Sequence, residues 1–159
     1  LKDLSSYYPK NVGIVLQSYL HRSYDDLMKN NINNVRICKG IYKESEKIAF
    51  KDRELININY LKLINHCFNN NIFVAIATHD IELIKSIYEL INNNNISSDF
   101  FEFQTLYGVP MNGMLQKHLK NNYKTRIYVP FGEAWYEYSL RRLKENPNIV
   151  KYILKDLFK

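Results

Sequence analysis

Five short runs of mostly apolar residues alternate along this chain with longer segments whose apolar residues recur every three or four positions. The short runs have the length of strands, and they cover residues 12–17, 35–39, 73–77, 100–104 and 125–129. Because each run is close to continuously apolar, we expect both faces of each strand to be buried, as in parallel sheets covered by helices. The alternation therefore predicts an α/β fold built from parallel βα units.

The segments between these runs carry the signals that begin and end helices. Ser23 and Asp80 have the side chains of N-caps, and each precedes an apolar periodicity typical of a helix. Asparagine runs at 69–71 and 92–95 stand where helices should stop, so loops are expected there. The predicted helices begin at Ser23, at about residue 55 (to 68), at Asp80 and at about 111 (to 119), followed by closing helices near 134–145 and 149–158.

A polar side chain stands at the end of each predicted strand. These residues are Gln17, Lys39, Thr78 with His79, Gln104 and Tyr128. The carboxyl ends of parallel strands meet at one edge of the sheet, where barrel and open α/β enzymes place their chemistry. Each residue also has a structural interpretation: a loop histidine without a ligand, a lysine that extends to solvent, or a glutamine that satisfies nearby backbone. Together they predict an enzyme, or part of one.

Arginines in one predicted strand and in one predicted helix are informative about function. Arg36 lies inside an apolar strand, where burial of an unpaired guanidinium group is costly, so we expect a ligand or an acidic partner. Arg141 and Arg142 are adjacent on a predicted helix, and Glu145 shares a face with Arg142. Such a pair suits a carboxylate or a phosphate, whereas the alternative is a solvated basic helix face.

The composition narrows the function classes. The chain has 159 residues, 46% of them hydrophobic, which fits one globular domain spanning residues 1–159. Its net charge of +6 suits an anionic ligand, a nucleic acid or an acidic membrane surface, and does not distinguish among them. The histidines and the two cysteines have no metal-type spacing, and the common nucleotide, hydrolase and zinc fingerprints are absent from the sequence. No metal is therefore expected.

Five ordered motifs resemble the flavin-dependent proline dehydrogenases, in particular the short monofunctional bacterial type. The resemblance covers essentially the whole chain, and its order and spacing make it specific, although each motif alone would be weak. The motifs are Asn11-Val12-Gly13-Ile14-Val15-Leu16-Gln17, Val35-Arg36-Ile37-Cys38-Lys39-Gly40, Ala77-Thr78-His79-Asp80, Phe101-Glu102-Phe103-Gln104-Thr105-Leu106-Tyr107-Gly108, and Arg126-Ile127-Tyr128-Val129-Pro130-Phe131-Gly132 with Arg141-Arg142-Leu143-Lys144-Glu145.

The resemblance implies a TIM-type (β/α)₈ barrel that holds FAD and oxidises L-proline to Δ1-pyrroline-5-carboxylate, with electrons passed to a quinone. The implied location is cytoplasmic, with peripheral contact to the inner face of the membrane as an alternative. The residues that match cofactor contacts are Gln17, Arg36, Lys39, Gly40, Ile41, Thr78 and His79. Those that match substrate contacts are Leu106, Tyr128, Arg141, Arg142 and Glu145, and the catalytic candidates are Arg36 and Tyr128.

The chain also departs from the family pattern. Family members begin with about three further βα units, which carry a substrate-binding lysine and an aspartate that cannot be assigned in this sequence. We therefore expect this chain to correspond to the C-terminal part of such a barrel, with about five βα units and the closing helices. Ile41 replaces an alanine beside the cofactor.

Two other functions remain open from the sequence alone. The chain could be a basic, non-enzymatic binding module, although its basic residues are spread along the sequence and form no nucleic-acid motif. It could also be a barrel fragment without activity of its own. Flavin absorbance after addition of FAD, and its bleaching by proline, would distinguish the three hypotheses.

Overall fold

The computed structural model describes residues 2–8, 11–29, 33–129, 131–133 and 136. The five predicted strands are confirmed, as are the four predicted helices that fall within these residues. The apolar pattern does not predict α1, which is only six residues long. The elements are α1 (Lys2–Tyr7), β1 (Ile14–Gln17), α2 (Ser23–Lys29), β2 (Asn34–Cys38), α3 (Arg53–Asn69), β3 (Phe73–Ala77), α4 (Ile81–Asn93), η1 (Ser98–Phe100), β4 (Phe101–Leu106), α5 (Met114–Lys120) and β5 (Thr125–Tyr128).

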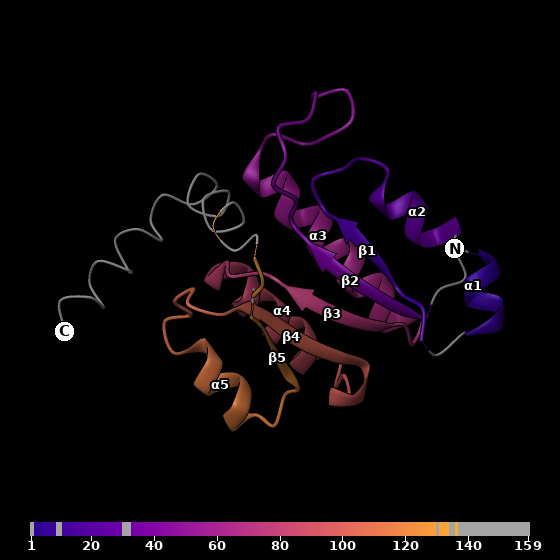
Figure 1. Ribbon diagram of the computed structural model, residues 1–159. Helices are drawn as coiled ribbons and strands as arrows, with labels where there is room; N and C mark the ends of the chain where they lie inside the picture. Colours follow the sequence, from indigo (N-terminus) through magenta and orange to yellow (C-terminus); the bar gives the residue numbers. More distant parts are fainter. Residues whose placement is uncertain (1, 9–10, 30–32, 130, 134–135, 137–159) are drawn as a thin grey trace.

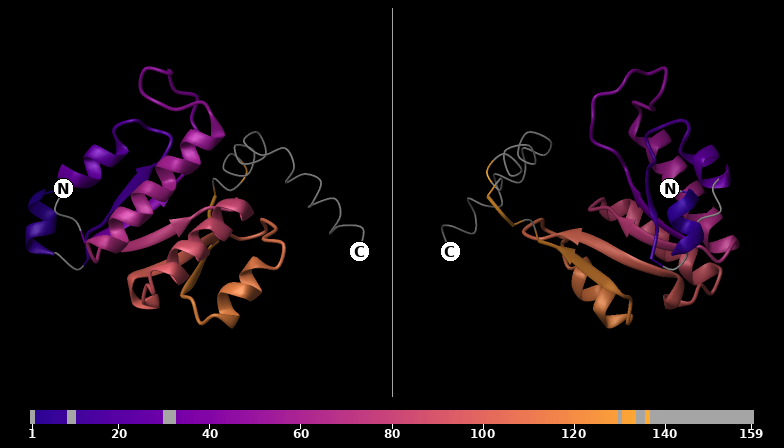
Figure 2. Two further views of the ribbon diagram at one scale, coloured as in Figure 1. Left: turned by 180° about the vertical axis from the view of Figure 1, so that it is seen from behind. Right: turned by 45° about the vertical axis from the view of Figure 1, so that its right-hand side comes forward.

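The strands form one parallel sheet in the order β1-β2-β3-β4-β5, so each strand pairs with the next strand along the chain. Right-handed crossovers that all advance in one direction place their helices on the same face of the sheet. Figure 1 shows the strands in front of the helices, and the view from behind shows the helices in front of the strands (Figure 2). This singly wound arrangement is that of a (β/α)₈ barrel segment, as predicted; a doubly wound sheet would reverse its strand order.

The hydrophobic core lies between the sheet and its helices. On the sheet side, alternate strand residues such as Val35, Ile37 and Ile76 are fully buried, and they pack with the inward faces of α3 and α4. Each such side chain stabilises the fold by roughly 1.5–3 kcal/mol relative to an exposed position. This one-sided core anchors the strands and leaves their other residues available for a site.

The prediction that both faces of the strands are buried is wrong for β1, β2 and β5, each of which has exposed residues, whereas in β3 and β4 residues on both faces are buried. Side chains alternate across a strand, so the residues between the core positions point to the opposite face. In β2 the buried Val35 and Ile37 flank the exposed Arg36. In β1 the residue Val15 is 57% exposed. We call this side of the sheet the open face.

Aspartate and asparagine residues define the helix ends. Asp52 caps α3, and Asp80 caps α4 by accepting a hydrogen bond from the Leu83 amide, which confirms the predicted role of Asp80. Asn71 and Asn95, which follow α3 and α4, have positive φ angles of 54° and 50°. Asparagine tolerates this left-handed conformation better than most residues, which explains why the asparagine runs end these helices.

Candidate active site

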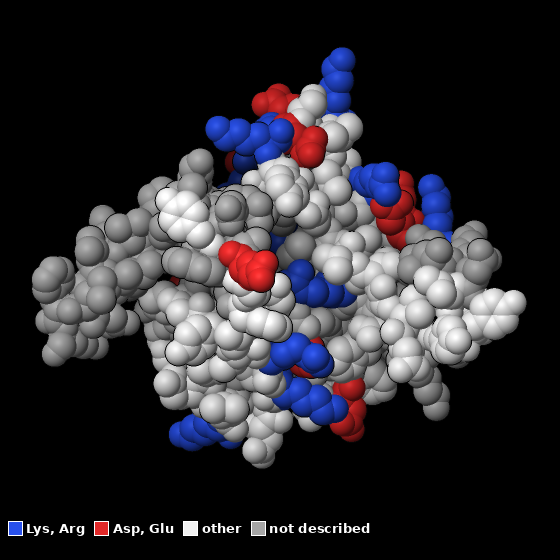
Figure 3. Space-filling model, viewed as in Figure 1, with Lys and Arg blue, Asp and Glu red and all other residues white. Residues whose placement is uncertain are grey.

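Two adjoining cavities lie at the carboxyl end of the open face, with volumes of about 520 and 610 Å³. Both are lined by Arg36, Ala77 and His79, so they form one continuous concave surface. The predicted convergence of the strand ends is confirmed, because this surface contains Gln17, Lys39, Thr78, His79, Gln104 and Tyr128. The molecule is hollowed on this face, with Lys and Arg side chains in and beside the hollow (Figure 3).

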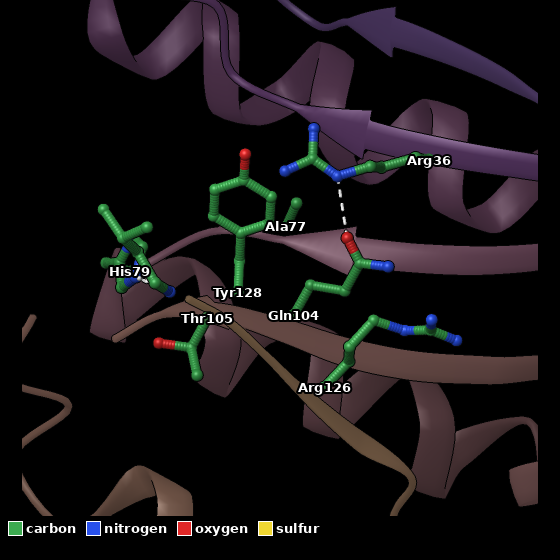
Figure 4. Close-up of a pocket in the computed structure, with 8 residues that line it drawn as sticks. Arg36, Ala77, His79, Gln104, Thr105, Arg126 and Tyr128 are labelled. Atoms are coloured by element: carbon green, nitrogen blue, oxygen red, sulfur yellow. Dashed lines mark hydrogen bonds between the residues drawn. The ribbon is translucent and has the colours of Figure 1, made fainter. Parts of the chain in front are cut away.

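A chain of hydrogen bonds crosses the open face from β2 to β5. Arg36 Nε donates to Gln104 Oε1 at 2.7 Å (Figure 4). Gln104 Nε2 in turn donates to Glu102 Oε1 at 2.6 Å. Glu102 also accepts from Arg126, at 2.8 Å from Nε and 3.1 Å from Nη2. The expectation that Arg36 is buried is wrong: the residue is exposed, because it points to the open face, and its Nε donates to a neutral amide.

Asp80 binds two cations at the other end of the surface. Its Oδ2 accepts from Lys39 Nζ at 2.5 Å and from Arg53 Nη2 at 2.7 Å, while its Oδ1 caps α4. Burial, the largest single influence, would raise the pKa of Asp80, but the hydrogen bonds from Lys39, Arg53 and the Leu83 amide together hold that pKa well below its usual value. One carboxylate against two cations leaves this corner with a formal charge of +1.

His79 is fixed by a backbone contact. The Leu106 N–H donates to His79 Nε2 at 2.9 Å, so Nε2 is the unprotonated nitrogen and the ring proton lies on Nδ1. Burial lowers the pKa of His79, which favours this neutral form. His79 therefore presents a neutral N–H donor at the junction of the two cavities. The neighbouring Thr78 is buried, and its hydroxyl accepts from the Asp80 N–H.

Position 40 requires glycine for a structural reason that the sequence did not reveal. Its φ angle is +97°, and a Cβ atom at this position would lie 2.1 Å from the Tyr19 ring. Any side chain would therefore both strain the backbone and displace this ring. Gly40 lines the larger cavity, but the close neighbour that requires glycine within the described structure is Tyr19.

The remaining predicted residues occupy the rims of the surface. Gln17 is half-buried and Ile41 exposed, and both line the larger cavity. Leu106 and Tyr128 line the smaller cavity from β4 and the end of β5, and the Tyr128 ring projects into the space beside Arg36 and Gln104 (Figure 4). Arg141, Arg142 and Glu145 lie outside the described residues, as do the segments predicted to form the closing helices, apart from Tyr136.

Sequence reasoning missed four charged residues at this site. Glu102 and Arg126 complete the hydrogen-bonded chain, and Asp80 and Arg53 complete the ion pairs with Lys39. Glu102 offered a signal, because an acidic residue in the middle of an apolar strand needs a partner when buried. Arg53 offered none, since its contact with Asp80 depends on the packing of α3 beside α4.

The surface can bind a flat, anionic ligand. Small residues, Ala75 and Ala77, lie in β3 between the longer side chains of β2 and β4, and Arg36 and Lys39 supply positive charge. Preorganised cations and N–H donors of this kind stabilise negative charge that develops on a bound group. Among the described residues, no group of three or more His, Cys, Asp or Glu side chains could hold a metal ion. No helix in this part of the chain is long and apolar enough to cross a membrane.

Comparison with known proteins gives a consistent result. The family model for proline dehydrogenase matches residues 2–153. Proline dehydrogenase 2 of Bacillus subtilis strain 168 is 39% identical over 160 residues, which covers 99% of this chain and 52% of that protein. The proline dehydrogenase of Deinococcus radiodurans is 35% identical over 153 residues, covering 94% of this chain and 49% of that protein. The chain thus spans about half the length of the curated relatives it matches.

A solved structure shares the fold. The crystal structure of proline utilization A from Bdellovibrio bacteriovorus, inactivated by N-propargylglycine, matches with a TM-score of 0.73 and 27% sequence identity. The match covers 84% of this chain and 16% of that much longer chain.

Proposed function

Because this chain belongs to the proline dehydrogenase family, we propose that its open face is part of a flavin-dependent site that oxidises L-proline. The observation that carries this proposal is the gathering of strand-end side chains on one concave surface. Arg36 and Lys39, within and just after β2, and His79, after β3, line adjoining cavities. Their sequence motifs match cofactor contacts of the family. The activity belongs to the natural polypeptide that carries this chain.

The residues of the surface fit FAD. A flavin ring needs a flat floor, and the alanines of β3 leave one between β2 and β4. The cofactor also carries two phosphates, which suit the net positive corner formed by Lys39, Arg53 and Asp80. Gln17, Arg36, Lys39, Gly40, Ile41, Thr78 and His79 would hold it.

The substrate would lie at the smaller cavity. Leu106 and the Tyr128 ring would pack on the proline ring, and the Tyr128 hydroxyl would supply a polar contact. Arg141 and Arg142 would bind the carboxylate, and Glu145 would orient an arginine; these three roles rest on the sequence motif.

When bound, FAD would supply the redox chemistry as the acceptor of a hydride from the ring carbon C5 of proline whose amine has first lost its extra proton; the product is then the protonated imine of Δ1-pyrroline-5-carboxylate. The chain's own residues orient the ring and exclude water around it. Arg36 would stabilise negative charge beside the cofactor, since its guanidinium keeps its full charge while bound to a neutral amide. Electrons would then pass to a quinone, and the enzyme would act in the cytoplasm or at the inner face of the membrane.

The second candidate function is a basic binding module without catalysis, and the net charge of +6 supports it. On the face drawn in Figure 3, however, the described Lys and Arg residues are interspersed with Asp and Glu. A nucleic-acid surface usually presents a continuous basic stripe instead. The flavin site is therefore the better supported proposal.

The visible spectrum of the natural polypeptide tests the proposal. We expect purified protein to retain flavin absorbance after addition and removal of excess FAD, and L-proline to bleach it without oxygen. A protein that takes up no flavin would overturn the cofactor proposal. A flavin-loaded protein that L-proline does not bleach would overturn the substrate proposal while leaving the cofactor in place.

A further inference from the structure

We propose that Gln104, held by Glu102, is a positioning residue that fixes the orientation of the Arg36 guanidinium in the cavity. The hydrogen bonds of the open face carry this inference, and its test rests on the proposed function because bound flavin is the reporter. The role differs from that of a flavin contact, because Gln104 would act through Arg36.

Glu102 is the most firmly held side chain of these hydrogen-bonded residues. Its side chain is 10% exposed, and its carboxylate accepts from Arg126 through both oxygens, a bidentate contact that restricts rotation. The same Oε1 atom accepts from Gln104 Nε2 at 2.6 Å. An ionised carboxylate offers acceptors only, so it binds the amide nitrogen of Gln104 and repels its oxygen.

The orientation of the Gln104 amide decides what Arg36 meets. With Nε2 directed to Glu102, Oε1 is directed to Arg36 Nε, where it accepts at 2.7 Å. A flipped amide would set two donors against each other at Arg36 and an oxygen against the Glu102 carboxylate. Glu102 therefore selects the single amide orientation that binds Arg36.

The register of the sheet explains why this contact forms. Arg36 lies on β2 and Gln104 on β4, so the arginine crosses β3 to reach it, over a span of about two strand spacings. Ala75 and Ala77 are the open-face residues of β3 at this level. Their small side chains leave the path clear, and a larger residue would block it. The bond holds Nε and sets the plane in which the rest of the guanidinium extends beside the Tyr128 ring (Figure 4).

A double-mutant cycle on the flavin reduction potential tests the inference in the natural polypeptide loaded with FAD. Arg36→Met should lower the potential, because reduced anionic flavin loses a nearby cation. Gln104→Met, which keeps the side-chain length but removes both hydrogen bonds, should lower it by a smaller amount. We expect about a tenfold change in the affinity ratio of reduced to oxidised flavin, which corresponds to about 30 mV for a two-electron couple. Gln116→Met, at an exposed position on α5, is the matched control.

Coupling is the decisive outcome. If Gln104 acts through Arg36, Gln104→Met has no further effect in the Arg36→Met background. Equal effects of Gln104→Met with and without Arg36 would overturn the inference, and so would a potential that Gln104→Met does not change. If Arg36→Met itself leaves the potential unchanged, the proposed place of the flavin beside Arg36 fails instead, so the two failures are distinguishable.

Gln104→Glu provides a second test should Gln104→Met fold poorly. Two adjacent carboxylates raise the pKa of one of them, so acidification adds a proton to the pair. The protonated carboxyl can again donate to one neighbour and accept from the other. We expect the potential, relative to wild type at each pH, to return toward the wild-type value as pH falls. This return should be smaller in the Arg36→Met background, where only the direct effect of the new charge on the flavin remains. A return of equal size in that background would contradict the positioning role.

Discussion

Arg36 and Lys39 carry the same charge at neighbouring positions, but their partners leave them with different capacities to attract an anion. Arg36 binds a neutral amide and keeps its full positive charge in the cavity. Lys39 shares the Asp80 carboxylate with Arg53, so the three groups together offer one net positive charge. Arg36 is therefore the stronger electrostatic element beside the floor of the site, whereas Lys39 contributes as part of a cluster.

Asp80 contributes both to the site, through its ion pairs, and to the stability of the fold, through the cap of α4. Asp80→Asn keeps an N-cap for α4 but loses the charge opposite Lys39 and Arg53, and Asp80→Ala should cost about 1 kcal/mol more because the cap is lost too. Since the pKa of Asp80 lies below its unfolded value of 3.8, its ionic stabilisation is present above about pH 4 and is lost as pH falls further. Urea unfolding should therefore show a difference between wild type and Asp80→Asn that shrinks in acid. Glu82→Gln, at an exposed position in the same helix, is the control, and a pH-independent difference would contradict the assignment.

Two substitutions of Tyr128 distinguish the effect of ring packing from that of hydrogen bonding at the substrate cavity. In the natural polypeptide we expect Tyr128→Phe to keep its flavin and to lower kcat/KM for L-proline by about two- to tenfold, the effect of one neutral hydrogen bond. Tyr128→Ala should lower it further and also reduce discrimination against hydroxyproline, because the ring face no longer shapes the pocket. Steady-state kinetics with both substrates would show this. Normal turnover by Tyr128→Ala would leave Tyr128 without a substrate role.

At the scale of elements, an aromatic contact helps to hold α5 against the sheet. His118 of α5 is buried, stacks on Phe103 of β4 with ring centroids 4.0 Å apart, and bonds through Nδ1 to the Tyr88 hydroxyl of α4 at 2.7 Å. Burial, aided by the nearby charge of Lys117, lowers the pKa of His118 from 6.5 to about 4. The native state thus favours the neutral imidazole.

This contact predicts a pH-dependent stability. Between pH 6.5 and about 4 the unfolded chain binds a proton at His118 that the native chain does not, so the free energy of unfolding falls as pH falls. The full shift corresponds to a loss on the order of 3 kcal/mol. His118→Gln should remove this part of the pH dependence in chemical unfolding, whereas His66→Gln should retain it. Identical pH profiles for wild type and His118→Gln would refute the prediction.

The elements were largely predictable from sequence, and the open face was not. Strands and helices follow from local periodicity, and Asp80 and the asparagine runs mark helix ends by local backbone chemistry. Val15, Ala75 and Ala77 are apolar by type, so a sequence pattern counts them with the core, yet they belong to the open face. The contact of Arg36 with Gln104 joins residues 68 positions apart and depends on strand register, which no local pattern specifies.

For the molecule as a whole, the two edges of the sheet are the surfaces most prone to association with other chains. In the described sheet, β1 and β5 each pair on one side only, and Val15 and Ile127 are 57% and 45% exposed. Unpaired edges with apolar side chains are templates for association. We expect the 159-residue chain, produced by itself, to associate in light scattering and to bind FAD weakly. The double substitution Val15→Lys and Ile127→Lys should reduce the association. A monomeric chain that is soluble, flavin-loaded and oxidises proline would contradict this expectation.

A crystal structure of the natural polypeptide with bound FAD would test most directly whether the open face is the flavin site. We predict that the flavin ring lies on the open face over Ala77 and contacts Arg36, and that the rest of the cofactor reaches Lys39 and His79. The smaller cavity beside Tyr128 should remain available for proline. A flavin bound on the helix-covered side of the sheet, or one that contacts none of Arg36, Lys39 and His79, would contradict this account of the site.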